Sequence, residues 1–323
     1  MPLVLSTHAL HPRAAELIRT AARLEVVRSL EPDALMEAAR AADVIIVRAP
    51  LPRDLFAQAP SLRAAIRHGA GVDMIPVEEA TAAGVLVANV PGANARSVAE
   101  YVIFCALTLA RRFRRLDRDL RSNGWSAVRE RAVSTTEIRG KTLGIIGVGN
   151  VGREIVGLAN AMGMTLEAFR PSGTTVPSNA TWKPLDDVIR GADFLVLCCP
   201  LTDNTRGMMN GERLALMKRS AFLINVARGA VLVEEDLVQA LDQGRIAGAA
   251  LDVFQQQPLP SDHPLWVRDD VFLTPHLAGI TEESMRAMGE GAAREAIRVL
   301  NGMLPVNLVN PAVIPAYHAR FNR

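Results

Sequence analysis

Glycines at positions 147, 149 and 152 have the spacing of a loop that holds a dinucleotide. Residues 147–152 read GVGNVG, directly after a β-branched run and at the start of a helical pattern. Such glycines allow a tight turn and close backbone approach, so that a pyrophosphate can lie at the helix N-terminus. The predicted cofactor contacts are Gly147, Gly149, Asn150, Val151 and Gly152, and a purely structural glycine turn is the alternative.

Arg170 indicates which dinucleotide binds. It stands about 20 residues after the glycine motif, at the end of the next predicted strand, where an acid would bind the ribose 2′-hydroxyl of NAD. A guanidinium pairs with a 2′-phosphate, which an acid would repel. We therefore predict NADP, with Arg170 near its 2′-phosphate and Ser172 as a further cofactor contact. NAD, bound through other contacts, is the alternative.

Two series of short apolar or β-branched runs alternate with helical segments and must position these residues. The first series has runs at 3–5, 25–27, 44–47, 64–66 and 85–87, and the second at 142–146, 165–169, 194–199, 222–226, 247–253 and 271–274. Such βα repeats form parallel sheets with helices on both faces. The sequence thus predicts an α/β fold with two parallel βαβ domains.

Helix signals set the predicted domain boundaries. The long helix between the two series is expected to open at Ser97-Val98-Ala99-Glu100, which has the pattern of a capping box. A last helix is expected from Thr281 to Asn301, and it has no strand partner of its own. We therefore predict a discontinuous first domain, residues 1–97 and 286–323, with an inserted domain of residues 98–285.

Composition argues against several kinds of partner. The chain has 323 residues with 36 basic and 34 acidic side chains, so its charge gives no basis for binding nucleic acid or an anionic membrane. The basic cluster at 111–115 continues with alternating charges, which is typical of a solvated helix end. The longest apolar segment, residues 98–110, is too short to cross a bilayer. With no secretory signal apparent, we expect a cytoplasmic protein without a metal site.

Taken together, the motifs resemble the D-isomer-specific 2-hydroxyacid dehydrogenases, a family that includes phosphoglycerate dehydrogenase and glyoxylate/hydroxypyruvate reductases. The resemblance covers nearly the whole chain, through the glycine motif and residues 67–73, 97–100, 199–205, 225–229, 251–254 and 274–276. It implies an NAD(P)-dependent oxidoreductase of small 2-oxo or D-2-hydroxy acids. It also implies a flavodoxin-like substrate domain that closes over a Rossmann cofactor domain, and a homodimer with the Ser97 helix at its interface.

The resemblance assigns roles to residues that follow the strands of the second series. Arg228 would hold the substrate and polarise its carbonyl, and His276 would exchange the proton, so that the developing alkoxide is stabilised and then protonated. Considered singly, Arg228 is equally well a helix-capping cation and His276 a buried structural histidine. The further cofactor positions are Cys199, Pro200, Thr205, Val226, Ala227, Asp252, Ala278 and Gly279.

A glycine-containing segment of the first domain resembles the substrate-carboxylate loop of the family. It consists of Arg67, His68, Gly69, Ala70 and Gly71, and its glycines free backbone N–H groups for a carboxylate. Arg67 also matches an arginine that contacts the phosphate in some phosphoglycerate dehydrogenases. Two interpretations follow: Arg67 pairs with a second anionic group of the substrate, or it only frames the cleft.

Residues 255–257 depart from the family pattern. The residue before Pro258 is normally a glutamate that hydrogen-bonds the catalytic histidine and supports its protonated form, but here it is Gln257. A glutamine keeps the hydrogen-bond acceptor and loses the charge. Asp252 is no substitute, because the family carries an aspartate there in addition to the glutamate.

This departure leaves other function classes open. One is a catalytically weak, dinucleotide-sensing interaction protein on the same fold. Another is a dehydrogenase of an inorganic oxyanion such as phosphite, because the same loop and arginine would serve. The presence of both Arg228 and His276 favours an active enzyme of 2-oxo acids.

Overall fold

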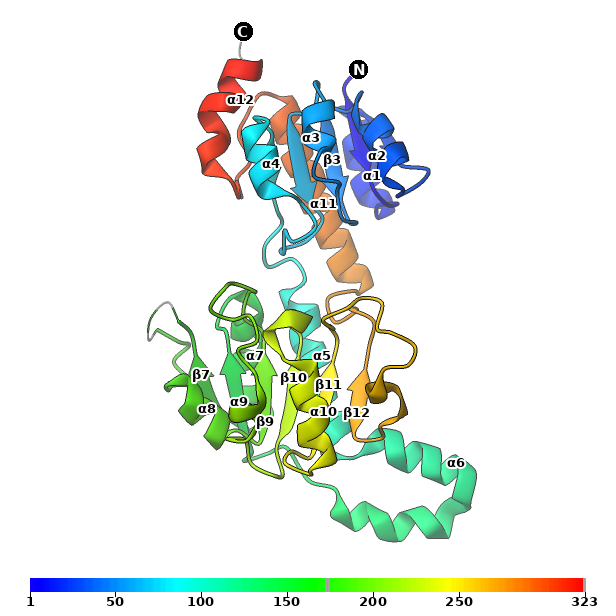
Figure 1. The fold of residues 1–323 in the computed structure, drawn as a ribbon, viewed down its shortest axis with the longest axis vertical. Helices are drawn as coiled ribbons and strands as arrows, with labels where there is room; N and C mark the ends of the chain where they lie inside the picture. Colours follow the sequence, from blue (N-terminus) through cyan, green and yellow to red (C-terminus); the bar gives the residue numbers. More distant parts are fainter. Residues whose placement is uncertain (172, 174, 322–323) are drawn as a thin grey trace. The chain divides into compact units, whose positions relative to one another are not determined.

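The computed structural model describes residues 1–171, 173 and 175–321, and the chain divides into two compact units (Figure 1). Unit 1 contains Met1–Asn94 and Ile280–Arg323, and unit 2 contains Ala95–Gly279. The sequence-based boundaries lie at residues 97 and 285, a few residues after each of these crossings. Ser172, which we predict at the cofactor, lies outside the described residues.

Unit 1 is built on a parallel sheet that has five strands among the described residues, in the order β2-β1-β3-β4-β5. Its strands are β1 (Leu3–Ser6), β2 (Arg23–Val26), β3 (Val44–Val47), β4 (Ala64–Arg67) and β5 (Leu86–Ala88). Its helices are α1 (Pro12–Arg19), α2 (Pro32–Ala39), α3 (Leu55–Gln58), α4 (Val77–Ala82), α11 (Glu282–Leu300), η4 (Pro311–Val313) and α12 (Ile314–Phe321). This strand order is the flavodoxin-like one.

The central strand β3 shows why this sheet is covered on both faces. Its four residues are all fully buried, with Ile45 and Val47 in one apolar cluster and Val44 and Ile46 in another. Since successive side chains of a strand point to opposite faces, an unbroken β-branched run requires apolar cover on both sides.

Unit 2 is built on a larger parallel sheet, which has seven strands among the described residues in the order β12-β11-β10-β9-β6-β7-β8. Its strands are β6 (Thr142–Ile146), β7 (Thr165–Phe169), β8 (Thr181–Trp182), β9 (Phe194–Leu197), β10 (Phe222–Asn225), β11 (Gly248–Leu251) and β12 (Val271–Leu273). Its helices are α5 (Ala95–Ala110), α6 (Phe113–Arg129), η1 (Glu130–Ser134), α7 (Asn150–Ala161), α8 (Leu185–Gly191), α9 (Gly211–Leu214), η2 (Gly229–Val231), α10 (Glu234–Asp242) and η3 (Pro264–Val267).

The structure corrects one helix start and adds one strand. The predicted capping box at Ser97 is wrong: α5 already begins at Ala95, because Ala95 and Arg96 are good helix formers and extend the first turn. A capping box does occur at α11, where the Thr281 hydroxyl accepts from Ser284 N at 3.2 Å and Ser284 Oγ accepts from Thr281 N at 2.9 Å. The edge strand β8 is a two-residue element that the sequence pattern missed.

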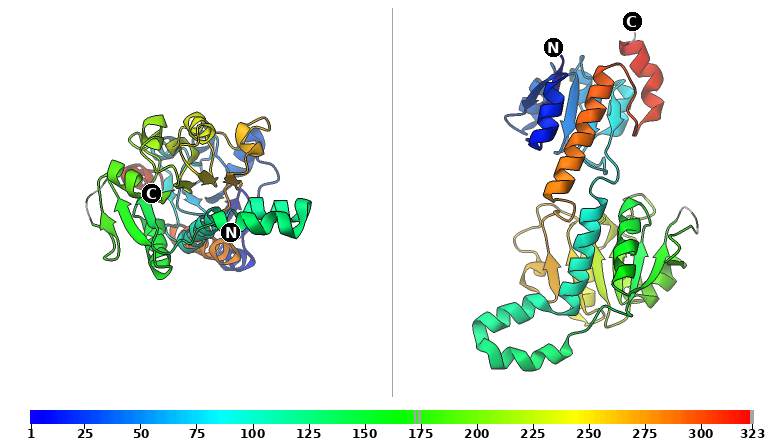
Figure 2. Two further views of the ribbon diagram at one scale, coloured as in Figure 1. Left: turned by 90° about the horizontal axis from the view of Figure 1, so that it is seen from below. Right: turned by 180° about the vertical axis from the view of Figure 1, so that it is seen from behind.

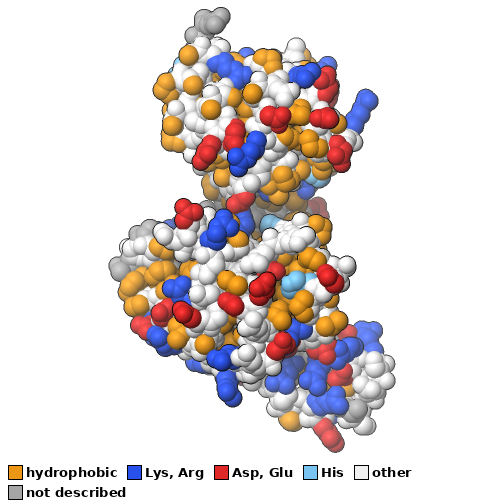
Figure 3. Space-filling view, in the orientation of Figure 1, with side chains coloured by type: hydrophobic (Ala, Val, Ile, Leu, Met, Phe, Trp, Pro, Cys, Tyr) orange, Lys and Arg blue, Asp and Glu red, His pale blue; other side chains and the backbone are white. Residues whose placement is uncertain are grey.

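Helix α6 extends away from the sheet of unit 2, with a kink at Gly124 (Figure 2). The arginines at 111–115 are exposed where α5 ends and α6 begins, as predicted for a solvated helix end. Acidic and basic side chains are interspersed on the face that Figure 3 shows. Within the described part of the chain, no helix has both the length and the apolar character needed to cross a membrane.

Candidate active site

The predicted cofactor and catalytic residues of unit 2 gather at one edge of its sheet. They follow the carboxyl ends of β6, β7, β9, β10, β11 and β12, and these ends meet at the same edge because the strands are parallel. Chain order reverses between β6 and β9, which are neighbours in the sheet. In open α/β sheets ligands bind at such a switch point, outside the carboxyl ends of the strands.

Geometry explains why glycine stands at each of the three positions of the motif. Gly147 has φ of 105°, and a Cβ there would lie 2.6 Å from Cys199 N. A Cβ on Gly152 would lie 2.3 Å from Gly147 O, whereas a Cβ on Gly149 would meet no atom of the described residues within 4 Å. The first and third glycines therefore allow close packing of the loop, and the second leaves room beside the N-terminus of α7. This arrangement fits a pyrophosphate.

Arg170 lies directly after β7 and beside this loop. Gly147 N donates to Phe169 O at 2.9 Å, which ties the glycine loop to the residue before Arg170. The Arg170 side chain is half-buried, and Nη1 donates to Thr175 O at 3.4 Å. A cation therefore stands at the end of this strand, beside the glycine loop.

The segment after β9 forms a compact turn. Thr205 is buried, and its hydroxyl donates to Pro200 O at 2.7 Å and accepts from Thr202 N at 2.8 Å. Thr205 therefore shapes this turn through its own hydroxyl. Cys199 is buried, and burial raises the pKa of its thiol to about 11.

Asn225 organises the loop that carries Arg228. Its Oδ1 accepts from Ala227 N at 3.1 Å, and its Nδ2 donates to Arg228 O at 3.3 Å. Val226 N donates to Leu197 O at 3.1 Å, and Arg228 Nη1 donates to Ala227 O at 2.7 Å. Asn225 stands inside the 225–229 motif, but the residue types of that motif did not indicate this role.

The loops after β10 and β11 pack closely through Gly229. A Cβ there would lie 1.9 Å from the carbonyl carbon of Phe254, so only glycine fits beside this backbone. Two further bonds join the loops: Gln255 N donates to Glu234 Oε1, and Gln255 Nε2 donates to Leu232 O at 3.0 Å. The sequence pattern gave no indication of Glu234.

Gln257 lies beside His276, as the resemblance implies. Gln257 Oε1 is 3.2 Å from His276 Nδ1, and Gln257 Nε2 donates to Phe254 O at 3.4 Å. Because the amide nitrogen donates to a carbonyl, the amide oxygen faces the imidazole and accepts from Nδ1–H. The other ring nitrogen, Nε2, is then the atom that can exchange a proton with a substrate.

Asp252 holds the segment that presents His276. Its carboxylate is buried and accepts from Thr274 Oγ1 at 2.7 Å, Leu277 N at 2.8 Å and Ala278 N at 2.9 Å. His276 N donates to Asp252 O at 2.8 Å, and His276 has φ of 56°. This left-handed conformation is uncommon outside glycine and is maintained here by several hydrogen bonds.

The predicted substrate loop lies in unit 1, directly after β4. Arg67 donates from Nε to Gly71 O at 2.9 Å and from Nη1 to Val47 O at 2.7 Å and His68 O at 3.0 Å. Its guanidinium therefore fixes the loop. Among the described residues, the backbone N–H groups of Ala70 and Gly71 have no hydrogen-bond partner, whereas Gly69 N donates to Arg67 O at 3.0 Å.

His68 is directed into the interior of unit 1. Its side chain is only 3% exposed, and its buried Nε2 makes no hydrogen bond with the described residues. A Cβ on Gly289 would lie 3.5 Å from that nitrogen, so α11 covers the ring. Burial, together with the charges of Arg48 and Arg67, lowers the pKa of His68 to about 4. The His68 side chain therefore faces the core of unit 1, and the assignment of His68 to substrate binding stays a prediction.

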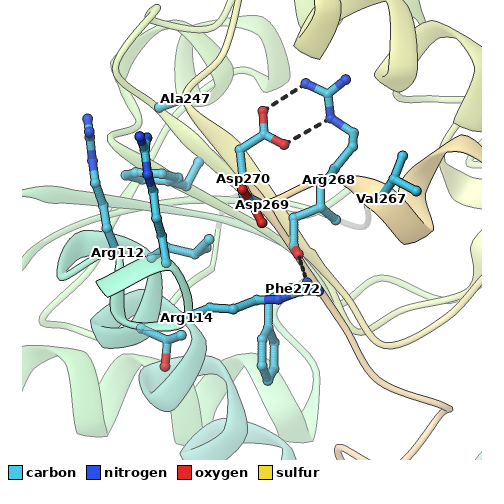
Figure 4. A pocket seen from close by; sticks show the side chains of 13 residues that line it. Arg112, Arg114, Ala247, Val267, Arg268, Asp269, Asp270 and Phe272 are labelled. Atoms are coloured by element: carbon cyan, nitrogen blue, oxygen red, sulfur yellow. Dashed lines mark hydrogen bonds and ion pairs between the residues drawn. The ribbon is translucent and has the colours of Figure 1, made fainter. Parts of the chain in front are cut away.

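A cavity of about 560 Å³ in unit 2 lies away from these loops (Figure 4). Its lining includes Phe222 and Val271, the first residues of β10 and β12, and Ala247, which directly precedes β11. It therefore opens at the amino edge of the sheet, opposite the candidate site. Arg268 and Asp270 are paired beside it through two bonds of 2.9 and 2.8 Å.

Known proteins are similar to this chain in sequence and in fold. The family model described as D-isomer specific 2-hydroxyacid dehydrogenase, NAD binding domain, matches residues 103–278. The chain is 37% identical over 321 residues to D-3-phosphoglycerate dehydrogenase from Methanocaldococcus jannaschii, with 98% of this chain and 60% of that protein covered. It thus spans about three-fifths of that relative's length. It is 36% identical over 325 residues to glyoxylate reductase from Aeropyrum pernix, with 97% of each protein covered.

A solved structure agrees with this likeness. It is the NADPH-dependent glyoxylate/hydroxypyruvate reductase from Sinorhizobium meliloti in complex with NADP and malonate. The two chains are 27% identical, the alignment covers 97% of each, and the TM-score is 0.84.

Proposed function

This chain belongs to the D-isomer specific 2-hydroxyacid dehydrogenase family, and we propose that it reduces small 2-oxo acids such as glyoxylate or hydroxypyruvate with NADPH. Membership confirms the predicted family, the α/β fold and the class of activity, which is hydride transfer between NAD(P)H and a 2-oxo or 2-hydroxy acid. The choice of substrate and the preference for NADPH are the proposed steps.

The observation that carries the proposed site is the arrangement of Gln257, His276 and Arg228 on neighbouring strand ends of unit 2. When bound, the dinucleotide supplies the hydride. Arg228 is proposed to hold the substrate carboxylate and polarise the carbonyl, which stabilises charge on the developing alkoxide. His276 then protonates that oxygen from Nε2, while Gln257 holds the ring through Nδ1.

The loop of unit 1 is proposed to contribute to carboxylate binding. The available N–H groups of Ala70 and Gly71 are suitable donors, and Arg67 maintains the loop conformation that presents them. The substrate-binding role of unit 1 and the cofactor-binding role of unit 2 are both part of this proposal.

NADPH preference rests on Arg170. It stands at the carboxyl end of β7, beside the glycine loop, where an acid would be needed for the ribose hydroxyl of NAD. The Sinorhizobium meliloti relative is described as NADPH-dependent. NAD remains the alternative cofactor.

A homodimer is also proposed. Helix α5 exposes Phe104 and Leu107, and α6 exposes Phe113 and Trp125, of which Trp125 is 71% exposed. Exposed apolar side chains on two successive helices support an interaction surface there. Mass measurement by light scattering tests this, and a monomer at micromolar concentration would contradict it. A cytoplasmic location stays a prediction.

Parallel assays with NADPH and NADH test the proposed activity. Glyoxylate, hydroxypyruvate and a phosphorylated 2-oxo acid are compared as substrates, and phosphite is tested with NADP⁺ and NAD⁺. Turnover of a 2-oxo acid with NADPH is the expected result. Binding of the dinucleotide without turnover would favour the sensing protein that Gln257 leaves open, and turnover of phosphite alone would favour the oxyanion enzyme.

A further inference from the structure

A buried carboxylate lies at the start of α10, outside the group of residues predicted from the sequence. Glu234 is 5% exposed, and burial raises the pKa of its carboxyl group. A carboxylate in such surroundings requires hydrogen-bond partners, because removal from water disfavours its charge. Its next neighbour Glu235 belongs to the same helical turn but is exposed.

The partners of Glu234 are on the loop that follows β11. Oε1 accepts from Gln255 N, and Oε2 lies 3.7 Å from His263 Nε2. Gln255 is held a second time, because its Nε2 donates to Leu232 O at 3.0 Å. Residue 255 is therefore tied to the segment 232–234 by its backbone and by its side chain.

This attachment lies next to the contact with the imidazole. Phe254 O, one residue before Gln255, accepts from Gln257 Nε2 at 3.4 Å, and Gln257 Oε1 lies 3.2 Å from His276 Nδ1. The position of the 254–255 backbone therefore sets the position of the Gln257 amide. A hydrogen bond to a charged acceptor is stronger than one between neutral groups, so Glu234 holds this backbone more firmly than a neutral residue would.

We propose that Glu234 is a positioning residue for proton transfer, which acts through Gln255 N and Gln257 on the orientation of the His276 ring. The inference rests on the proposed role of His276 as the proton donor. It differs from a general role in helix stability, because an acid in the first turn of α10 would serve the helix dipole equally well at Glu235.

A double-mutant cycle tests the connection. Glu234→Ala and Gln257→Ala are each expected to lower kcat for reduction about tenfold, the effect of losing a hydrogen bond that holds a reacting group. The double variant is expected to lose no more than Gln257→Ala alone, because both changes release the same contact. The dissociation constant for NADPH, measured by its fluorescence, is expected to stay within about twofold of the unmodified protein.

Two further variants separate positioning from structure. Glu235→Ala, the matched control, is expected to leave kcat unchanged. Glu234→Gln keeps an acceptor for Gln255 N but loses the charge, so it is expected to lose less of the rate than Glu234→Ala and more than Glu235→Ala. If Glu234→Ala fails to fold, a rate for Glu234→Gln equal to that of Glu235→Ala would contradict the proposal. The proposal would be overturned if the losses of kcat in Glu234→Ala and Gln257→Ala multiplied in the double variant, or if Glu235→Ala lost as much kcat as Glu234→Ala.

A spectroscopic readout keeps this inference separate from the proposed activity. The ring ¹⁵N resonances of His276, assigned by their absence in His276→Asn, report the tautomer without turnover. They are expected to change in Glu234→Ala and to stay in place in Glu235→Ala. Absence of turnover in the unmodified protein would contradict the proposed function, whereas unchanged resonances in Glu234→Ala would contradict the role of Glu234.

Discussion

Gln257 Oε1 lies 3.2 Å from His276 Nδ1, at the position where the sequence resemblance implies a glutamate. The amide accepts the ring N–H as a carboxylate would, but it adds no negative charge. The contact therefore fixes the tautomer and orientation of the imidazole, and it omits the electrostatic support for the imidazolium.

The basic limb of the pH profile for reduction is expected to move upward in Gln257→Glu. A carboxylate within about 4–6 Å of an imidazole typically raises the imidazole pKa by about 1–3 units, because it stabilises the charged form. Reduction needs the imidazolium as the proton donor, so the variant should keep its rate to higher pH. The measurement is kcat/KM against pH, with a solvent isotope effect to show that proton transfer contributes to the rate.

Gln256→Glu is the matched control for this prediction, because Gln256 is exposed and its replacement adds the same charge one residue away. Its profile should follow that of the unmodified protein, and NADPH affinity should be similar in all three. Superimposable profiles for Gln257→Glu and the unmodified protein would mean that residue 257 does not tune the proton donor.

Strand positions were largely predictable from the sequence, because each buried parallel strand requires a short apolar run. The runs at 44–47 and 142–146 correspond to β3 and β6 without any shift. The edge strand β8 was missed, since Thr181–Trp182 is too short to show a pattern. The start of α5 was misplaced because Ser97 has cap chemistry but follows residues that are already helical.

The supports of the candidate site were less predictable than its reacting groups. Arg228, Gln257 and His276 stand in recognisable motifs, whereas the contact between Glu234 and Gln255 joins residues 21 positions apart. Such a contact depends on how two loops pack, which a local pattern does not encode. His68 shows the opposite case: its motif was recognised, but its side chain faces the core of unit 1.

Arg170→Asp is expected to weaken NADPH binding by about ten- to a hundredfold and to improve NADH binding. Loss of a charge-assisted contact typically costs about 1.5–3 kcal/mol, and the new carboxylate repels a 2′-phosphate while it can accept a ribose hydroxyl. Fluorescence titration with both dinucleotides provides the measurement. Arg219→Asp, an equal charge change at an exposed residue before β10, is the control. Unaltered affinities in Arg170→Asp would contradict the NADPH preference.

Arg67→Met is expected to raise KM for glyoxylate and for a dianionic 2-oxo acid by similar factors. The guanidinium bonds to the carbonyl oxygens of Val47, His68 and Gly71, so its loss should disorder the loop for every carboxylate substrate. Steady-state kinetics with both acids decide this, with Arg53→Met as the control because that side chain is 85% exposed. A selective loss for the dianionic acid would instead support direct pairing with a second anionic group.

Acid is expected to destabilise unit 1 through His68. Its pKa is about 4 in the folded chain because of burial and the charges of Arg48 and Arg67, and the ordinary value is 6.5. The unfolded chain therefore takes up this proton first as the pH falls. The contribution of His68 to the free energy of unfolding is fully present above its ordinary pKa. It is lost progressively as the pH falls towards the pKa of the folded chain, by about 3 kcal/mol in total. Urea denaturation of the full chain at pH 7 and pH 5 measures the part lost in this interval.

His68→Gln isolates that contribution, because glutamine does not titrate. The variant is expected to have a lower free energy of unfolding at pH 7, since its side chain fits the space beside Gly289 less well, but a smaller decrease between pH 7 and pH 5. His318→Gln, on the exposed surface of α12, should keep the decrease of the unmodified protein. Equal decreases in His68→Gln and the unmodified protein would show that another group causes the acid sensitivity, and His8 would be the next residue to replace because burial and Arg48 lower its pKa too.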